Sequence, residues 1–156
     1  MFSRFWAWYN RNYAVNLRIA TILFFLQLLH LFWLTTHIVT LRLIGTSFFP
    51  EFLSLPLALV DYTEIPAIVS IALVYLNEIF TGKAQLKSYV LLSFLASQLF
   101  HLFWITDEVI VGQLTGAVPI ALPPLLSWLA IVIDYLELPV MVDTLSRAIR
   151  VGAREK

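Results

Sequence analysis

The chain has 156 residues, of which 60% are hydrophobic, 13% are charged and none is cysteine. A soluble domain has about 45–50% apolar and about 25% charged residues, so this composition indicates an integral membrane protein. The absence of cysteine excludes disulfides, thiolate metal sites and cysteine nucleophiles. The formal net charge is zero, and the sequence has no basic patch with interleaved aromatics, so no nucleic-acid partner is expected.

The hydropathy pattern predicts an all-α, polytopic membrane protein. Residues 1–16 are rich in aromatic residues and arginine, which is typical of a helix in the membrane interface. Four apolar segments follow, each long enough to cross about 30 Å of hydrocarbon at about 1.5 Å per residue. They cover about residues 17–43, 52–80, 86–111 and 122–149. We expect a four-helix transmembrane bundle in which membrane lipid is a constant partner; the oligomeric state is left open.

The basic residues predict the orientation of this bundle. Nine of them lie before the first span, between the second and third, or after the fourth: Arg4, Arg11, Arg18, Lys83, Lys87, Arg147, Arg150, Arg154 and Lys156. Arg42 lies on the opposite side. By the positive-inside rule both termini are cytoplasmic.

Two sequence blocks recur along the chain. QLLHLFWLTTH (27–37) returns as QLFHLFWITDE (98–108), and DYTEIP (61–66) returns as DYLELP (134–139). The pattern predicts one domain made of two tandem hairpins, repeat 1 at about 17–80 and repeat 2 at about 86–150. Equal orientation of the two hairpins would relate them by a pseudo-two-fold axis along the membrane normal, as in parallel-repeat transporters.

The recurring blocks carry polar residues that are expensive inside a membrane, at about 2.5–3.5 kcal/mol each. Helical spacing places the polar residues of each helix on one face. Counting along straight helices predicts a middle layer of His30, Glu64, His101 and Glu137. The same count predicts an outer layer of His37, Asp61, Glu108 and Asp134. Together these eight residues are expected to form one buried polar chamber.

Metal binding is the leading interpretation of this chamber. All eight residues are candidate ligands, and their donor set resembles that of carboxylate-bridged di-metal bundles, with iron, manganese or zinc as the ion. Such a centre would suit a redox enzyme acting on a lipid-soluble substrate. A bis-His haem between His30 and His101 is disfavoured, because the nearby carboxylates line a haem plane poorly.

Two further classes stay open, and whether the protein is an enzyme is not decided. In a metal-free pocket for a hydrophobic small molecule, a buried Glu64 or Glu137 could stay protonated and act as a catalytic acid. The expected pocket walls are Trp33, Trp104, Tyr62 and Tyr135. A proton or cation carrier is the third class, since intramembrane histidines and carboxylates also form relays.

Two prolines lie beside the carboxylates. Pro66 and Pro139 remove the amide partners of the Tyr62 and Tyr135 carbonyls. The pattern therefore predicts free carbonyls at membrane depth, which are normally found where they line a cavity.

The motifs Glu64-Ile65-Pro66 and Tyr135-Leu136-Glu137-Leu138-Pro139, with His30 and His101, resemble the EXPERA superfamily. That family includes emopamil-binding sterol isomerases and sigma-2-receptor-like proteins. The resemblance implies an intramembrane cavity for a sterol or other cationic or isoprenoid-like ligand. It also implies isomerisation by carboxylic-acid protonation of a carbon–carbon double bond. Asp61, Asp134 and the hairpin repeat have no counterpart in that pattern.

Overall fold

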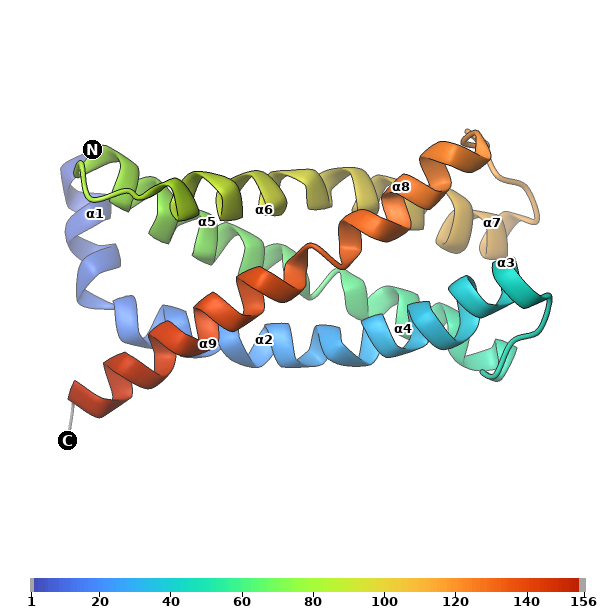
Figure 1. Ribbon diagram of the computed structural model, residues 1–156, viewed down its shortest axis with the longest axis horizontal. Coiled ribbons are helices and arrows are strands. Elements are labelled where there is room, and N and C mark those ends of the chain that lie inside the picture. The colour runs from blue at the N-terminus through green and yellow to red at the C-terminus, as the bar shows by residue number, and fades with distance from the viewer. Residues whose placement is uncertain (1, 155–156) are drawn as a thin grey trace.

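The computed structural model describes residues 2–154, which form helices and loops without a β-strand. Four long helices run side by side, and a short helix crosses one end of them (Figure 1). The helices are α1 (Phe2–Arg11), α2 (Tyr13–Trp33), α3 (Thr40–Ile44), α4 (Ser54–Asp61), α5 (Glu64–Phe80), α6 (Leu86–Trp104), α7 (Gly112–Thr115), α8 (Pro124–Asp134) and α9 (Glu137–Arg154). The π-helices η1 (Leu34–Val39) and η3 (Ile105–Val111) and the 3₁₀ turn η2 (Glu51–Leu53) complete the set.

These elements join into four helices that are long and apolar enough to span a membrane. They cover Tyr13–Ile44, Ser54–Phe80, Leu86–Thr115 and Pro124–Ala153. The predicted spans are therefore confirmed to within a few residues, and the chain is an all-α integral membrane bundle. Large apolar side chains such as Ile22, Phe25 and Leu43 are more than half exposed on its sides, as expected where lipid replaces water.

Each long helix is irregular at about the level of the polar residues. The first and third contain the π-helices η1 and η3, which start directly after Trp33 and Trp104. The second and fourth break after Asp61 and Asp134, before the prolines at 66 and 139. Backbone irregularity inside a membrane is tolerated where protein buries it, and here it lies among the packed helices.

The prediction that the Tyr62 and Tyr135 carbonyls are free is wrong. The Tyr62 carbonyl accepts a hydrogen bond from the Ile65 amide at 3.3 Å, and the Tyr135 carbonyl accepts one from the Leu138 amide at 3.2 Å. Proline removes only the bond from four residues ahead. The chain tightens locally, so an amide three residues ahead becomes the donor instead.

Two tight turns end the first and third spans. Gly45 and Gly116 adopt φ of 73° and 71°, a left-handed conformation that costs glycine no steric strain. These turns close the end of the bundle that carries α3 and α7, here named the α3/α7 end. Both termini and the α5–α6 loop lie at the opposite end, here named the terminal end (Figure 1).

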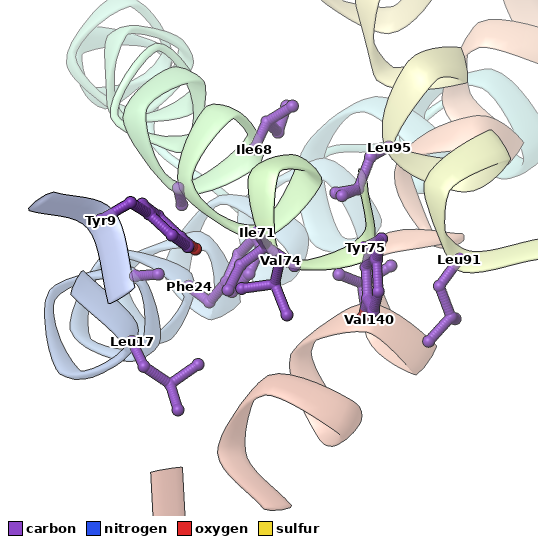
Figure 2. Close-up of a cluster of buried hydrophobic side chains, with 12 residues drawn as sticks. Tyr9, Leu17, Phe24, Ile68, Ile71, Val74, Tyr75, Leu91, Leu95 and Val140 are labelled. Carbon is purple, nitrogen blue, oxygen red and sulfur yellow. The ribbon is translucent and has the colours of Figure 1, made fainter. Parts of the chain in front are cut away.

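Two apolar clusters fill the bundle. The first lies toward the terminal end and includes Phe24, Ile71 and Leu95 (Figure 2). The second lies toward the α3/α7 end and includes Trp33, Ala58 and Trp104. On every span, buried polar residues of the recurring blocks lie between the residues of the first cluster and those of the second. The polar layer is thus enclosed by apolar packing on both sides.

A polar cluster closes the terminal end. Asp143 is 5% exposed and accepts hydrogen bonds from Tyr75 at 2.9 Å, from Lys87 and from Arg147 at 2.7 Å. Arg147 also donates to Glu78. Three donors from three helices thus bury this carboxylate.

The N-terminal helix α1 is fastened to the bundle by Tyr9. The Tyr9 hydroxyl donates to the Ser70 carbonyl at 3.1 Å, and its ring is 2% exposed. This burial raises the pKa of Tyr9 above its ordinary value of 10. The predicted position of residues 1–16 in the membrane interface stays a prediction.

Candidate metal centre

Two histidines and two aspartates meet in the centre of the bundle: His30 from α2, Asp61 from α4, His101 from α6 and Asp134 from α8. We call them the His/Asp quartet. Each of these side chains is at most 1% exposed. The His30 Nε2 lies 3.5 Å from Asp61 Oδ1 and 3.7 Å from Asp134 Oδ2. The His101 Nε2 lies 3.5 Å from Asp61 Oδ2 and 3.6 Å from Asp134 Oδ1.

The other ring nitrogen of each histidine fixes its tautomer. His30 Nδ1 lies 3.1 Å from the Leu57 carbonyl oxygen, and His101 Nδ1 lies 2.9 Å from the Ala130 carbonyl oxygen. A carbonyl only accepts, so Nδ1 must carry the proton. In the neutral ring the Nε2 lone pair then faces the aspartates. A backbone carbonyl on the second nitrogen is the usual way to orient a metal-binding histidine.

The separations within the quartet suit an ion better than hydrogen bonds. N–H···O bonds are about 2.7–3.2 Å long, and all four His–Asp separations are longer. Ligand atoms held about 2.0–2.2 Å from a tetrahedral ion lie about 3.3–3.6 Å from one another. Each of the four His–Asp separations, 3.5–3.7 Å, runs to a different carboxylate oxygen, and one ligand atom from each residue lies within 4.8 Å of the others. The quartet therefore brings together the donor types of a four-ligand metal site at close range.

Two glutamates lie beside the quartet. Glu64 begins α5, Glu137 begins α9, and both are buried. Carboxylate oxygens of Glu64, Asp134 and Glu137 all lie within 4.8 Å of one another. Asp134 thus belongs to both groups, and six of the eight predicted ligands gather in one continuous cluster.

Polar atoms without protein partners concentrate in this cluster. Among the described residues, thirteen buried side-chain nitrogen and oxygen atoms have no hydrogen-bond partner in the protein. Two are donors, the indole nitrogens of Trp33 and Trp104. The other eleven are acceptors, and they belong to Gln27, His30, Asp61, Glu64, Gln98, His101, Asp134 and Glu137. Buried polar groups are normally satisfied, so this excess of acceptors points to cations, either metal ions or protons.

His37 and Glu108 lie apart from the cluster, toward the α3/α7 end. Both His37 ring nitrogens contact serine hydroxyls, Ser47 at Nδ1 and Ser54 at Nε2. Glu108 accepts from Ser127 and, at 3.0 Å, from Arg42. The single chamber of eight residues expected from the sequence is therefore divided.

The two predicted layers also differ from the structure. Counting residues placed Asp61 and Asp134 with His37 and Glu108, yet they lie with His30 and His101. The count assumed straight helices with a constant rise. The π-helices, the breaks at the second and fourth spans and the helix tilt visible in Figure 1 all violate that assumption.

The four aromatic residues predicted as pocket walls have other contacts. Trp33 and Trp104 pack on His30 and His101, with ring centroids 5.3 Å and 5.4 Å apart. The hydroxyls of Tyr62 and Tyr135 pair with Thr106 and Thr35 of the opposite half. An apolar groove lies elsewhere, between α2 and α9. It is lined by Thr21, Phe24, Phe25, Leu28, Leu138, Met141, Val142 and Leu145.

Equivalent hydrogen bonds occur in both halves of the chain. Gln27 donates to the Asp61 carbonyl at 3.0 Å, and Gln98 donates to the carbonyls of Ile133 at 3.1 Å and Asp134. These amides tie α2 to the start of the break after α4, and α6 to the break after α8. They hold in place the backbone that carries the two aspartates.

The serines at 54 and 127 are site residues that motif reading missed. Ser54 contacts His37, and Ser127 donates to Glu108. The signal was present, because these two serines are separated by the same 73 positions as Asp61 and Asp134. Each also precedes its aspartate by seven residues, two helical turns on the same face.

Comparison of the chain with protein-family models, with curated proteins and with solved structures finds no match. The EXPERA resemblance accordingly stays a prediction. Fold and site together define the class: an integral membrane four-helix bundle that buries a cluster of histidines and carboxylates with the geometry to hold a metal ion.

Proposed function

We propose that this protein is a membrane-embedded metal-binding protein and that the His/Asp quartet holds one divalent transition-metal ion. The observation that carries the proposal is the position of the two Nε2 atoms. Each is fully buried, has no hydrogen-bond partner, and lies 3.5–3.7 Å from one oxygen of each aspartate. Lone pairs facing carboxylates without a proton between them repel, and an ion between them removes that repulsion.

The donor set limits the identity of the ion. Two imidazoles and two carboxylates suit zinc, iron and manganese. When bound, iron or manganese supplies redox chemistry, and zinc supplies Lewis-acid chemistry. Apolar packing encloses the site on both sides, so a substrate entering between the helices would be lipid-soluble. We propose redox chemistry on such a substrate as the activity, with the glutamate pair beside the ion as its proton donors or acceptors.

Two structural features support the predicted architecture. Gln27 and Gln98 donate to equivalent backbone carbonyls in the two halves. The hydroxyls of Tyr62 and Tyr135 each pair with a threonine of the other half. Both features fit two hairpins derived from one ancestral unit. Helix α1, the α5–α6 loop and the last turns of α9, which carry most of the Lys and Arg residues of the described part of the chain, lie at the terminal end (Figure 1). We propose that this end is cytoplasmic.

A metal-free pocket for a hydrophobic ligand is the second candidate function, and the groove between α2 and α9 favours it. The groove reaches Leu138, the residue after Glu137. Such a ligand, sterol-like by the EXPERA resemblance, would still leave the eleven buried acceptors without a cation. The carrier alternative has less support, because the apolar cluster around Ile71 fills the bundle below the site (Figure 2).

Elemental mass spectrometry of protein purified in detergent without chelators tests the proposal. About one or more equivalents of zinc, iron or manganese is the expected result, with the His30→Ala variant depleted. Protein that holds no metal and gains none on dialysis against these ions would contradict it. Identification of a co-purifying lipid in that sample would then favour the second candidate.

A further inference from the structure

The glutamate pair, Glu64 and Glu137, lies close to Asp134 but outside the quartet. Glu64 and Glu137 face each other from the first turns of α5 and α9, and both are at most 1% exposed. Both oxygens of Glu64 and Oε1 of Glu137 have no hydrogen-bond partner among the described residues. Helix packing alone does not explain two unpartnered acids at this depth.

Charge balance favours a second cation beside the quartet. The cluster contains four carboxylates. A histidine that ligates an ion through Nε2 keeps its single proton on Nδ1, which lies against a backbone carbonyl here, so both rings are neutral when the ion is bound. One divalent ion on the quartet therefore leaves two negative charges. Uncompensated charge in a membrane interior is costly, so two further positive charges are needed nearby.

The positions of the three carboxylates suit a shared ion. Oxygens of Glu64, Glu137 and Asp134 lie within 4.8 Å of one another, so inward rotation of the side chains can bring all three onto one ion. The amide oxygens of Gln27 and Gln98 are also buried without partners. Each glutamine lies three residues before a quartet histidine, one turn along the same face. Their amide nitrogens are already used on backbone carbonyls, so the neutral oxygens remain as acceptors.

We propose that Glu64, Glu137 and Asp134 form a second cation site, and that it takes a hard divalent ion such as Mn²⁺ or Mg²⁺. This inference rests on the proposed metal site at the quartet. The second site offers only oxygen ligands, which hard cations prefer, whereas the quartet offers two imidazole nitrogens. Asp134 bridges the two ions. The result is a di-metal centre with two chemically different positions, not two equal ones.

Stepwise loading of the full-length protein in detergent tests this inference. The protein is stripped with a chelator, loaded with one equivalent of Zn²⁺ and titrated with Mn²⁺. Bound zinc is measured by elemental mass spectrometry and bound manganese by electron paramagnetic resonance. One zinc and one manganese per chain are expected. In the double variant Glu64→Gln, Glu137→Gln, zinc should stay at one equivalent while manganese affinity falls at least about tenfold.

Two further variants control the titration. Asp107→Asn removes a carboxylate from η3 that accepts from the Ile120 amide and lies outside the cluster; it should bind both ions like the wild type. Because a glutamine oxygen can still coordinate, the double variant Glu64→Leu, Glu137→Leu should abolish manganese binding. Gel filtration and thermal unfolding confirm that each variant is folded.

The outcomes separate the two proposals. Wild-type protein that binds one zinc and no manganese would overturn the second site and leave the quartet intact, with two protons supplying the missing positive charge. Equal manganese binding in the wild type and both double variants would also overturn it. Protein that binds neither ion would contradict the proposed function itself.

Discussion

His30 and Asp134 belong to opposite halves of the chain, yet their side chains meet at the bundle centre with Nε2 and Oδ2 3.7 Å apart. The matching pair, His101 and Asp61, lies 3.5 Å apart. Each histidine therefore faces one aspartate of its own hairpin and one of the other. The site is complete only when both hairpins pack together.

Loss of one histidine should remove the ion without unfolding the bundle. His30→Ala deletes one of four ligands and leaves the apolar clusters on both sides intact. We expect less than about one tenth of the wild-type zinc affinity with unchanged helical circular dichroism. Isothermal titration of zinc into chelator-stripped protein measures the change. Wild-type affinity in the variant would show that His30 is not a ligand.

The effect of Asp61→Asn on stability should change sign with metal. Without metal, this substitution removes one of several unpartnered buried acids, so we expect the free energy of unfolding to rise by about 1–3 kcal/mol. With saturating zinc the variant should be the less stable protein, because it binds the ion more weakly. Thermal unfolding in detergent with and without zinc measures both. The same sign in both conditions would argue against a metal at the quartet.

Equivalent substitutions in the two halves should have comparable effects. Asp61 and Asp134 contact the same two histidines at 3.5–3.7 Å. Asp61→Asn and Asp134→Asn should therefore weaken zinc binding to the quartet by similar factors. Zinc titrations run side by side provide the comparison. Unequal zinc affinities of the two variants would contradict the two-fold arrangement. Loss of manganese binding in Asp134→Asn but not in Asp61→Asn is expected, because only Asp134 belongs to both sites.

The polar cluster around Asp143 at the terminal end should stabilise the fold without affecting metal binding. Asp143→Asn removes the charge that Lys87 and Arg147 contact, and a hydrogen-bonded buried charge contributes about 1–3 kcal/mol. We expect a lower thermal midpoint with wild-type zinc binding. Weakened zinc binding by folded protein would mean that the two regions are coupled through α9.

Arg42 should control how fast a bound ion leaves. At the α3/α7 end Arg42 pairs with Glu108 and lies over the rings of Trp104 and Trp128, and Trp104 in turn packs on the quartet residue His101. These contacts cover the quartet on that side. Contacts of this kind contribute about 1–2 kcal/mol. Arg42→Gln should therefore speed zinc loss to a chelator by about fivefold to thirtyfold. Stopped-flow measurement gives the rate; Lys83→Gln at the terminal end is the matched control and should leave it unchanged.

Sequence periodicity and composition predicted the four spans well, because a membrane helix reports itself through a run of apolar residues. Pro66 predicted a lost helical hydrogen bond at Tyr62 but not the break after Asp61 that accompanies it. The π-helices after Trp33 and Trp104 were not predicted either, since a π-turn leaves no composition signal of its own. A π-helical turn contains one more residue than an α-helical turn, which changes the side chains that lie at the same depth in the bundle.

The sequence identified the residues of the candidate site better than it predicted how they are arranged. The recurrence of His30 with His101 and of Asp61 with Asp134 identified the quartet residues. Grouping them required the crossing of helices from different hairpins, which sequence spacing within one helix does not contain. His37 illustrates the limit: its helical register matches His30, but two serines from other segments hold its ring.

X-ray absorption spectroscopy of the zinc-loaded protein tests the central claim most directly. We predict nitrogen and oxygen neighbours at about 2.0–2.2 Å and outer scattering from two imidazole rings, reduced to one ring in His30→Ala. A spectrum without imidazole scattering, unchanged by His30→Ala, would place the ion elsewhere and contradict the account.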